Sequence, residues 1–277
     1  MNRDRKLYGV AAVLLGVILL AGCQPAVPKV AGEAAERTLV PSIAIATWNV
    51  RGYPEKEAAQ RDWFGAKLLE LNPQVICIQE IANQAGVDTF LATESQYNHA
   101  AFNDSSDGQD NAIFSSAAVV MKDIDDPAGF QHPAQAAYVS CGGFDAVIVT
   151  VHLSWTNTAM RENEKQLLHD VVLKMLETDP DVIIAGDFNT KENDMKELAG
   201  AIGMEVMAVA GQEGVGTTHA GNRYDYFLVS PDLANEEAIG CHIITFSGGD
   251  LETAKKVSDH LPVLATFRTD ERFKDRK

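Results

Sequence analysis

The chain has 277 residues, enough for one large domain or two small ones, and a formal net charge of −16. Such an acidic surface repels polyanions at long range, which excludes a broad basic face for nucleic acid. A nucleic-acid substrate would need metal ions and a local group of arginines or lysines.

Residues 1–22 have the layout of a secretory signal peptide. Arg3, Arg5 and Lys6 form a positively charged start, and an apolar run follows from Val10 to Ala21. The run is shorter than the roughly 20 apolar residues that a membrane-spanning helix needs. We therefore predict that this segment is removed from the mature protein.

The end of the run, Leu20-Ala21-Gly22-Cys23, resembles the lipobox of bacterial lipoproteins. The resemblance implies that Cys23 becomes a lipidated first residue and anchors the protein in a membrane. The alternatives are an ordinary signal peptide with an unrelated cysteine, or an uncleaved N-terminal anchor. Loss of residues 1–22 leaves 277 − 22 = 255 residues and, because that segment carries +2, a charge of −16 − 2 = −18.

The lipoprotein resemblance also implies a location in the bacterial cell envelope. Gln24 stands where inner-membrane lipoproteins carry Asp, which favours the outer membrane or the cell surface. Residues 23–41 are rich in Pro, Ala and Glu and are predicted to form a flexible tether. Residues 42–268 contain no linker and are predicted to form one catalytic domain, followed by a polar tail over 269–277.

Short apolar runs predict most elements of the domain as strands. Helical spacing predicts three helices, and residues 83–110 fit no element clearly. Gly142-Gly143 indicates a hairpin turn between two strands. Few helices among many strands favour an α+β or mixed α/β domain. The predicted strands cover 43–49, 75–79, 112–121, 136–140, 144–151, 182–185, 224–229, 241–246 and 261–267, and the helices 55–71, 161–177 and 192–201.

The remaining cysteines give no indication of zinc, because no CxxC or Cys/His spacing occurs. Cys77 lies inside an apolar run and is predicted to be buried in a strand. Cys141 and Cys241 either pair, as an extracytoplasmic location permits, or remain free thiols.

One strand of the domain runs directly into Gly186-Asp187-Phe188-Asn189. Residues two apart in an extended segment point the same way, so Asp187 and Asn189 present two oxygens to one space. Mg²⁺ prefers oxygen ligands of this kind. The alternative is a turn that caps the following helix.

Polar residues recur at the ends of the other predicted strands, where loops usually carry binding and catalytic residues. Asn49 ends one strand, Glu80 ends a second and His152 ends a third. Tyr224-Asp225-Tyr226 opens a fourth, and Ser258-Asp259-His260 precedes the last. These positions predict one site at a common sheet edge.

The ordered set of motifs resembles the endonuclease/exonuclease/phosphatase superfamily over residues 42–268. This superfamily includes deoxyribonuclease-I-like nucleases, inositol-polyphosphate phosphatases and bacterial sphingomyelinases. The resemblance implies a four-layer α/β/β/α sandwich of two mixed sheets flanked by helices, and Mg²⁺-dependent phosphoester hydrolysis. The matching motifs are Thr47-Trp48-Asn49-Val50, Gln79-Glu80, Val151-His152-Leu153, Gly186-Asp187-Phe188-Asn189, Tyr224-Asp225-Tyr226 and Ser258-Asp259-His260-Leu261-Pro262.

The resemblance also implies a metal site and a phosphate-binding histidine. Glu80, helped by Asn49, would hold Mg²⁺, with Mn²⁺ or Ca²⁺ as alternatives, and Asp259 would lie beside the metal. His260 would contact the scissile phosphate or act as general base, and Asp225 would orient it.

The resemblance gives three further residues a role in hydrolysis. Asp187 would position or deprotonate the attacking water, and Asn189 would bind the phosphate. His152 would be a general acid or a phosphate contact, although the sequence offers it no clear carboxylate partner.

The sequence departs from the family in one respect. Many relatives carry an arginine that binds phosphate near the position of Gln131-His132-Pro133, and this chain has none there. Arg51 and Arg223 flank motif residues and are candidate substrate-binding replacements. Both are otherwise ordinary surface charges.

We therefore expect a monomeric, metal-dependent nuclease that cleaves DNA or RNA. A phospholipid or small-molecule phosphodiesterase, such as a sphingomyelinase-like enzyme, is the alternative. A non-catalytic binding lipoprotein is less well supported, since Glu80, Asp187, Asp259 and His260 are all present.

Overall fold

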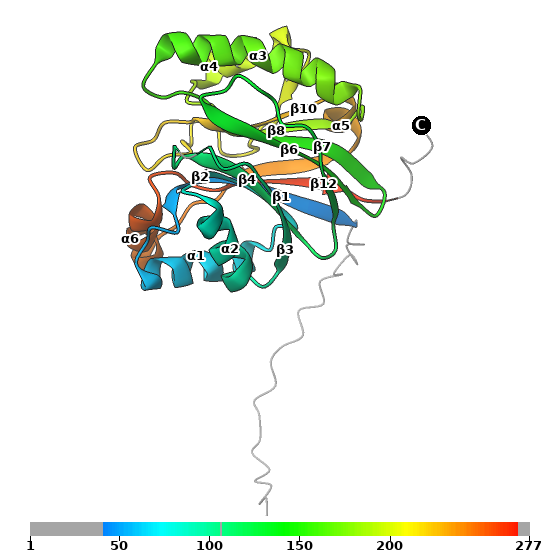
Figure 1. Ribbon diagram of the computed structural model, residues 1–277. Coiled ribbons are helices and arrows are strands. Elements are labelled where there is room, and N and C mark those ends of the chain that lie inside the picture. The colour runs from blue at the N-terminus through cyan, green and yellow to red at the C-terminus, as the bar shows by residue number, and fades with distance from the viewer. Residues whose placement is uncertain (1–40, 106, 271–277) are drawn as a thin grey trace, which may run out of the picture. The chain divides into compact units, whose positions relative to one another are not determined.

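The computed structural model describes residues 41–105 and 107–270 (Figure 1). Two six-stranded sheets pack face to face, and helices cover both outer faces. This confirms the predicted α/β/β/α sandwich. The predicted signal peptide, Cys23, almost all of the tether and most of the polar tail lie outside the described residues.

The first sheet has the strand order β11-β12-β1-β2-β4-β3. The β1–β2 pair is parallel and the other pairs are antiparallel, so the sheet is mixed. Helices α1, α2 and α6 lie on its outer side (Figure 1). The bounds are β1 Ser42–Tyr53, α1 Ala58–Leu71, β2 Val75–Ile81, α2 Gln84–Thr93, β3 Tyr97–Phe102, β4 Asp110–Ser116, β11 Ala238–Ile243, α6 Gly248–Val257 and β12 Val263–Arg268.

The second sheet has the order β5-β6-β7-β8-β10-β9. Its β7–β8 pair is parallel and is joined through α3, which lies with α4 on the outer face (Figure 1). The bounds are β5 Val120–Asp123, β6 His132–Cys141, β7 Phe144–His152, α3 Thr158–Leu176, β8 Val182–Asp187, α4 Glu192–Ala201, β9 Glu205–Val206, β10 Asp225–Val229 and α5 Pro231–Glu236.

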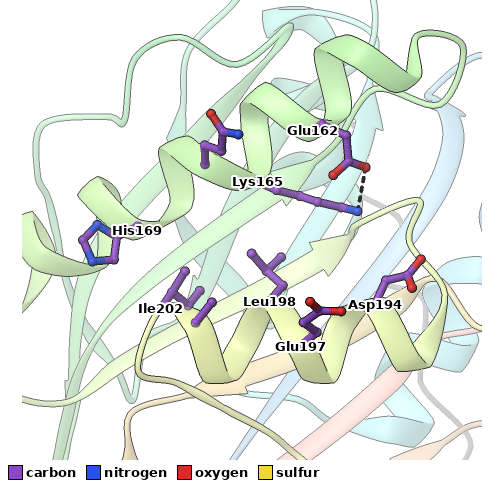
Figure 2. A pocket seen from close by; sticks show the side chains of 9 residues that line it. Glu162, Lys165, His169, Asp194, Glu197, Leu198 and Ile202 are labelled. Carbon is purple, nitrogen blue, oxygen red and sulfur yellow. Dashed lines mark hydrogen bonds and ion pairs between the residues drawn. The ribbon is translucent and has the colours of Figure 1, made fainter.

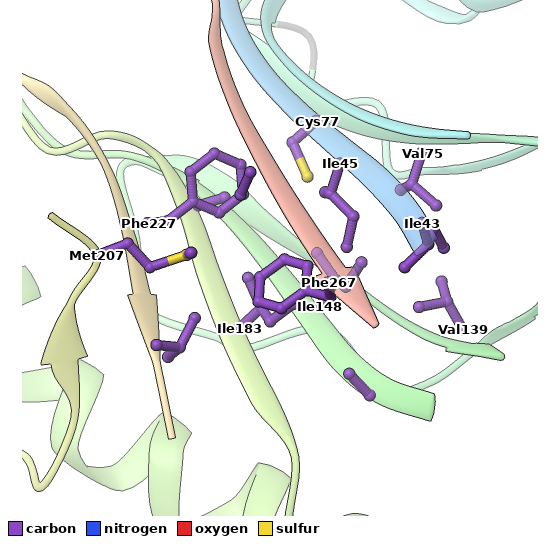
Figure 3. Close-up of a cluster of buried hydrophobic side chains, with 14 of the residues drawn as sticks. Ile43, Ile45, Val75, Cys77, Val139, Ile148, Ile183, Met207, Phe227 and Phe267 are labelled. Atoms are coloured by element: carbon purple, nitrogen blue, oxygen red, sulfur yellow. The ribbon is translucent and has the colours of Figure 1, made fainter. Parts of the chain in front are cut away.

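The main hydrophobic core fills the space between the two sheets (Figure 3). Ile45 and Cys77 reach it from the first sheet, and Ile148, Ile183 and Phe227 reach it from the second. All five side chains are essentially fully buried. Because side chains alternate along a strand, residues at even spacing from these five also face the inter-sheet space.

Several elements differ from the predictions. Residues 83–110 contain α2 and β3, which were not predicted. In α2, polar residues interrupt the apolar positions, so the buried Val87 and Phe90 give no clear helical pattern. The predicted strand 112–121 is two strands, β4 and β5, which belong to different sheets. Helices α5 and α6 were also not predicted, because α5 has only six residues and α6 buries only Ala254 and Val257, which give no clear apolar period.

The three described cysteines, Cys77, Cys141 and Cys241, are free thiols. Cys77 is buried in β2, as predicted. Cys141 and Cys241 are therefore not joined by a disulfide, which was one of the two predicted alternatives. In residues 41–105 and 107–270, no helix combines the length and apolar character needed to cross a membrane.

Candidate active site

A row of four titratable residues crosses the end of the second sheet. His132 on β6 pairs with His152 on β7, His152 pairs with Asp187 on β8, and Asp187 pairs with Asp225 on β10. Asp187 lies two residues after a core position of β8, and Asp225 lies two residues before a core position of β10. His152 lies four residues after the core residue Ile148 of β7. The site is therefore the polar end of the inter-sheet core.

A layer of neutral polar groups separates this row from the apolar core. Gln79 Nε2 donates to Thr47 Oγ1 at 3.1 Å and to Thr150 Oγ1 at 2.9 Å. All three residues are fully buried, and Thr150 belongs to the opposite sheet. Because buried polar groups must be paired, these hydrogen bonds fix the two sheet ends relative to each other.

Glu80 enters the site through an irregularity in β2. The residue after Gln79 in a regular strand would face α1 and α2 instead of the inter-sheet space. The pairing of β2 with β4 shifts between Ile78 and Ile81, and Glu80 has a φ of 63°. Such a bulge re-aims a side chain, and a non-glycine residue at this φ is uncommon. Asn49 Nδ2 donates to Glu80 Oε1 at 3.0 Å, which ties the carboxylate to β1.

Gly186 explains how Asp187 comes so close to β7. Its φ is 150°, and a Cβ there would lie 2.0 Å from the carbonyl oxygen of Val151. Only glycine permits this approach of β8 to β7. The glycine of the Gly-Asp-Phe-Asn motif therefore sets the position of the aspartate that follows it.

Asp187 is buried and surrounded by donors. Asn49 Nδ2 donates to its Oδ2 at 3.1 Å, and the Asn189 backbone N–H donates to its Oδ1 at 2.9 Å. Burial raises the pKa of Asp187, and the nearby His260 ring opposes that shift. A carboxyl group with a raised pKa is a better proton acceptor near neutral pH.

His260 lies between two carboxylates. Its Nδ1 is 2.8 Å from Asp225 Oδ2, and its Nε2 is 3.5 Å from Asp187 Oδ2. The orienting carboxylate that the resemblance implied is thus in contact with the ring. Burial disfavours the charged ring, but these carboxylates outweigh it and raise the pKa of His260 to about 10. The imidazole is therefore held as a cation at neutral pH.

The backbone around His260 is fixed from the first sheet. Trp48 Nε1 donates to the His260 carbonyl at 3.1 Å, and the His260 N–H donates to Ser258 Oγ at 3.0 Å. Ser258 Oγ in turn donates to the Asn49 carbonyl at 2.6 Å. The Thr-Trp-Asn and Ser-Asp-His motifs thus support each other although they are about 210 residues apart.

His152 has a different environment. It is 2% exposed, its Nε2 is 3.8 Å from Asp187 Oδ2, and its Nδ1 has no partner. Its ring stacks on His132 with centroids 4.7 Å apart, and His132 Nδ1 lies 2.9 Å from Asp107 Oδ2. Burial is the main cause that lowers the pKa of His152 to about 4, so the ring is neutral at physiological pH.

Sequence reasoning missed the roles of His132 and Asp107. The missing carboxylate for His152 is replaced by a stacked histidine that carries its own carboxylate. Counting along β6 and β7 from the Gly142-Gly143 turn places residue 132 or 133 opposite His152. The hairpin was predicted, so this pairing could have been found from the turn.

The site opens into a pocket of about 380 Å³. Its wall includes seven of the predicted site residues together with Arg51, whose side chain is 62% exposed and 3.9 Å from Asp259. Asp225 lies behind His260 and is 1% exposed. The seven are Asn49, Glu80, His152, Asp187, Asn189, Asp259 and His260.

The Arg223 side chain does not line this pocket, although Asn222 and Tyr224 on either side of it do. Its guanidinium is 3.6 Å from Glu192 and 5.0 Å above the Tyr226 ring, and its side chain is 12% exposed. Lys56 is a further cation that the sequence did not indicate, and its charge interacts with Glu80 and Asp259. Its Nζ donates to the Arg51 carbonyl, and burial, followed by the Arg51 charge, lowers the pKa of Lys56.

The donor set fits a hard divalent cation. Glu80 and Asp259 both line the pocket and offer carboxylate oxygens, the ligands that such ions prefer. Asn49 turns Nδ2 toward the carboxylates, so the two acids are the anionic donors. Asp187, Asp225 and His260 also lie within 4.8 Å of one another, but both ring nitrogens of His260 already face carboxylates.

A larger cavity of about 570 Å³ lies between α3 and α4, on the outer face of the second sheet (Figure 2). Its lining includes Glu162, Asp194 and Glu197, and Lys165 pairs with Glu162 at 2.9 Å. These are helix surface residues, and the strand-end motifs do not contribute to this cavity.

Three solved structures share the fold. D. rerio TDP2 complexed with single strand DNA product is 20% identical with a TM-score of 0.67, over 82% of this chain and 99% of that one. The human Nocturnin catalytic domain with bound sulfate anion is 17% identical with a TM-score of 0.62, over 83% and 95%. An endonuclease/exonuclease/phosphatase from Bacteroides vulgatus is 16% identical with a TM-score of 0.64, over 82% and 98%.

Among curated protein sequences, none matches this chain. The fold of these neighbours is that of phosphoester hydrolases that are typically metal-dependent. The Endonuclease/Exonuclease/phosphatase family model matches residues 46–260, and the chain therefore belongs to that family.

Proposed function

We propose that this protein is an extracytoplasmic, metal-dependent nuclease that hydrolyses phosphodiester bonds. The observation that carries the proposal is the convergence of Glu80, Asp187, Asp259 and His260 in one open pocket. They come from three separate strand ends, with Asp259 and His260 adjacent before β12, and a purely structural role would not require all four to face the same space. The DNA product named for the TDP2 structure supports nucleic acid as the substrate class.

Glu80 and Asp259 would hold the cation, with Asn49 Nδ2 fixing the Glu80 carboxylate, and the cation when bound would neutralise charge on the phosphoryl oxygens. His260, flanked by Asp225 and Asp187, would donate a hydrogen bond to the phosphate. Asp187 would accept the proton of the attacking water, because its pKa is raised and its Oδ1 is already held by the Asn189 N–H. Asn189 Nδ2 donates to the Leu153 carbonyl at 2.9 Å, which aligns it at the pocket wall.

The test is a substrate panel with the purified domain. Plasmid DNA, single-stranded RNA, sphingomyelin and bis-p-nitrophenyl phosphate are each incubated with Mg²⁺, Mn²⁺ or Ca²⁺ and with EDTA. We expect cleavage of DNA or RNA that requires the cation and stops in EDTA. Turnover of sphingomyelin or the small diester, with no nucleic acid cut at low salt, would contradict the nuclease assignment.

The alternative is a phospholipid or small-molecule phosphodiesterase. The observation that favours it is the net charge of −16, which gives no general attraction for a polyanion. A single phosphodiester group needs fewer cationic contacts than a strand. The same panel separates the two candidates.

We also propose that lipidated Cys23 anchors the protein in the bacterial envelope, on the strength of Leu20-Ala21-Gly22-Cys23. Mass spectrometry of the membrane fraction should find a mature chain that begins at an acylated Cys23. An unmodified terminus, or one that retains residues 1–22, would contradict the anchor.

A further inference from the structure

An exposed tryptophan lies at the rim of the catalytic pocket. Trp155 follows His152-Leu153-Ser154, is 62% exposed and lines the pocket together with His152 and Asn189. The described chain has seven exposed large apolar side chains, and Trp155 is the one that lines this pocket. A single exposed apolar residue is ordinary, but its place beside the reacting groups requires an explanation.

The backbone that carries Trp155 is held in place from three sides. The Ser154 N–H donates to Glu164 Oε2 at 2.8 Å, and Arg161 Nη1 donates to the Ser154 carbonyl at 2.8 Å. Asn189, itself a pocket residue, donates to the Leu153 carbonyl. Glu164 is fully buried, so its contact is strong. The indole is thus attached to a fixed segment and loses little freedom when it binds a ligand.

The chemistry of the rim favours a flat, uncharged ligand group. A phosphate near Asp187 and His260 carries its ester substituents along the pocket wall, where Trp155 and Tyr224 lie. Arg51 is the one lysine or arginine among the residues that line the pocket, so affinity for a nucleic acid must come partly from contacts that need no charge. Stacking of a base on an aromatic side chain is such a contact.

We propose that Trp155 is a stacking platform for the nucleobase next to the scissile phosphate, which makes an unpaired strand the preferred substrate. A base inside a duplex is already stacked on its neighbours, whereas a single strand or a frayed end offers a free face. This inference rests on the proposed nuclease function. It adds the base-binding residue and the preference for single strands.

A membrane surface is a different reading of an exposed tryptophan. Interfacial tryptophans usually act with other apolar or basic side chains. Here Thr156, Asn157 and Thr158 follow Trp155, and Asn157 caps α3 by accepting from the Met160 N–H at 3.0 Å. The one basic side chain in contact with this segment, Arg161, is engaged by the Ser154 and Trp155 carbonyls, and residues 156–158 are polar and uncharged, which favours the base.

The test compares Trp155→Ala and Trp155→Phe with Leu69→Ala, an exposed apolar side chain on α1 that is 66% exposed. Each variant is assayed with Mg²⁺ on a short single-stranded oligonucleotide and on the same oligonucleotide with an abasic residue beside the scissile phosphate. Trp155→Ala should raise KM about tenfold or more on the complete oligonucleotide. It should leave the abasic substrate unchanged, Trp155→Phe should retain most of the affinity, and Leu69→Ala should match the wild type.

Binding gives a readout that does not depend on turnover. In EDTA, the oligonucleotide should quench the tryptophan emission of the wild type, and Trp155→Phe should lose that quenching, since Trp48 is buried and Trp63, on α1, does not line the pocket. Equal losses on the complete and abasic substrates would overturn the stacking role. The stacking role would also be overturned if Trp155→Ala lost binding to sphingomyelin–phosphatidylcholine vesicles while its KM for the oligonucleotide stayed unchanged. If the wild type cuts no nucleic acid, the proposed function itself fails.

Discussion

His260 and His152 approach the same carboxylate oxygen of Asp187, at 3.5 and 3.8 Å, yet their surroundings drive them to opposite charge states. His260 is flanked by a second carboxylate, and its pKa is raised to about 10. His152 stacks on His132 with an unpartnered Nδ1, and its pKa is lowered to about 4. Because both side chains are imidazole rings, the difference between their pKa values comes from the neighbouring residues.

The difference divides the pocket into two sides. On the His260 side, Arg51, Asp259 and Asp225 supply charge and hydrogen bonds. On the His152 side, the exposed Trp155 supplies flat aromatic surface, and the neutral His152 ring is stacked on the buried His132. A pocket built this way can hold a phosphate on one side and an uncharged group of the substrate on the other.

Loss of the charged histidine should give the largest effect. His260→Asn removes the ring that Asp225 orients, so kcat on an oligonucleotide should fall by about 10² or more. Glu80→Gln and Asp187→Asn should cause losses of the same order. Steady-state kinetics with Mg²⁺ measures the effect, and circular dichroism verifies the fold. Near-normal turnover by a folded His260→Asn protein would remove His260 from the mechanism.

The pH dependence of stability should separate the two histidines. His152 stays neutral in the folded protein down to a pKa of about 4, whereas the unfolded chain binds that proton near pH 6.5. Stability should therefore fall by about 1.4 kcal/mol per pH unit as the pH drops through this window. Urea unfolding in EDTA, repeated across this pH range, should show that the free energy of unfolding of His152→Asn falls less steeply with decreasing pH than that of the wild type.

His260 should act with the opposite sign. Its raised pKa stabilises the fold fully below about pH 6.5, and that contribution is lost as the pH rises toward 10. Relative to the wild type, His260→Asn should therefore lose most stability at and below about pH 6.5 and approach the wild type in alkali. Parallel curves for the two histidine variants would contradict the contrast drawn between their environments.

Removal of the stacked ring should have a smaller effect. His132→Leu deletes a ring contact worth about 0.5–1.5 kcal/mol, so kcat should fall about two- to tenfold if the stack orients His152. His99→Leu, on β3, is the matched control because His99 is an exposed histidine far from the row. An unchanged kcat for His132→Leu would show that His152 needs no support from β6.

The smallest effect should concern salt. Arg51→Ala should make the log–log dependence of KM on NaCl shallower by about 0.7 for a single-stranded substrate, the slope expected for one phosphate contact. Lys196→Ala, an exposed cation on α4, should leave the slope unchanged. Trp155→Ala should raise KM without altering the slope, which would separate the charged side of the pocket from the aromatic one.

Arg223 illustrates a limit of sequence reasoning. It stands next to a motif, as Arg51 does, and both were equal candidates for substrate binding. The fold turns Arg223 onto Tyr226 and Glu192 and leaves Arg51 exposed at the pocket. Arg223 precedes β10 and turns away from the pocket that its neighbours Asn222 and Tyr224 line, so proximity to a motif in sequence does not place a side chain in the site.

Local sequence determined most of the strands, the hairpin turn at Gly142-Gly143 and the strand-end position of each motif, because apolar runs and turn residues act over a few positions; the sandwich itself followed from the family resemblance. Only the tertiary structure decided which motifs meet. Asn49 reaches Asp187 across 138 positions and Asp225 reaches His260 across 35, the bulge aims Glu80, and the surroundings give two histidines opposite charge. Packing of the two sheets creates these contacts, and the pKa of a buried group depends on neighbours that its own segment does not contain.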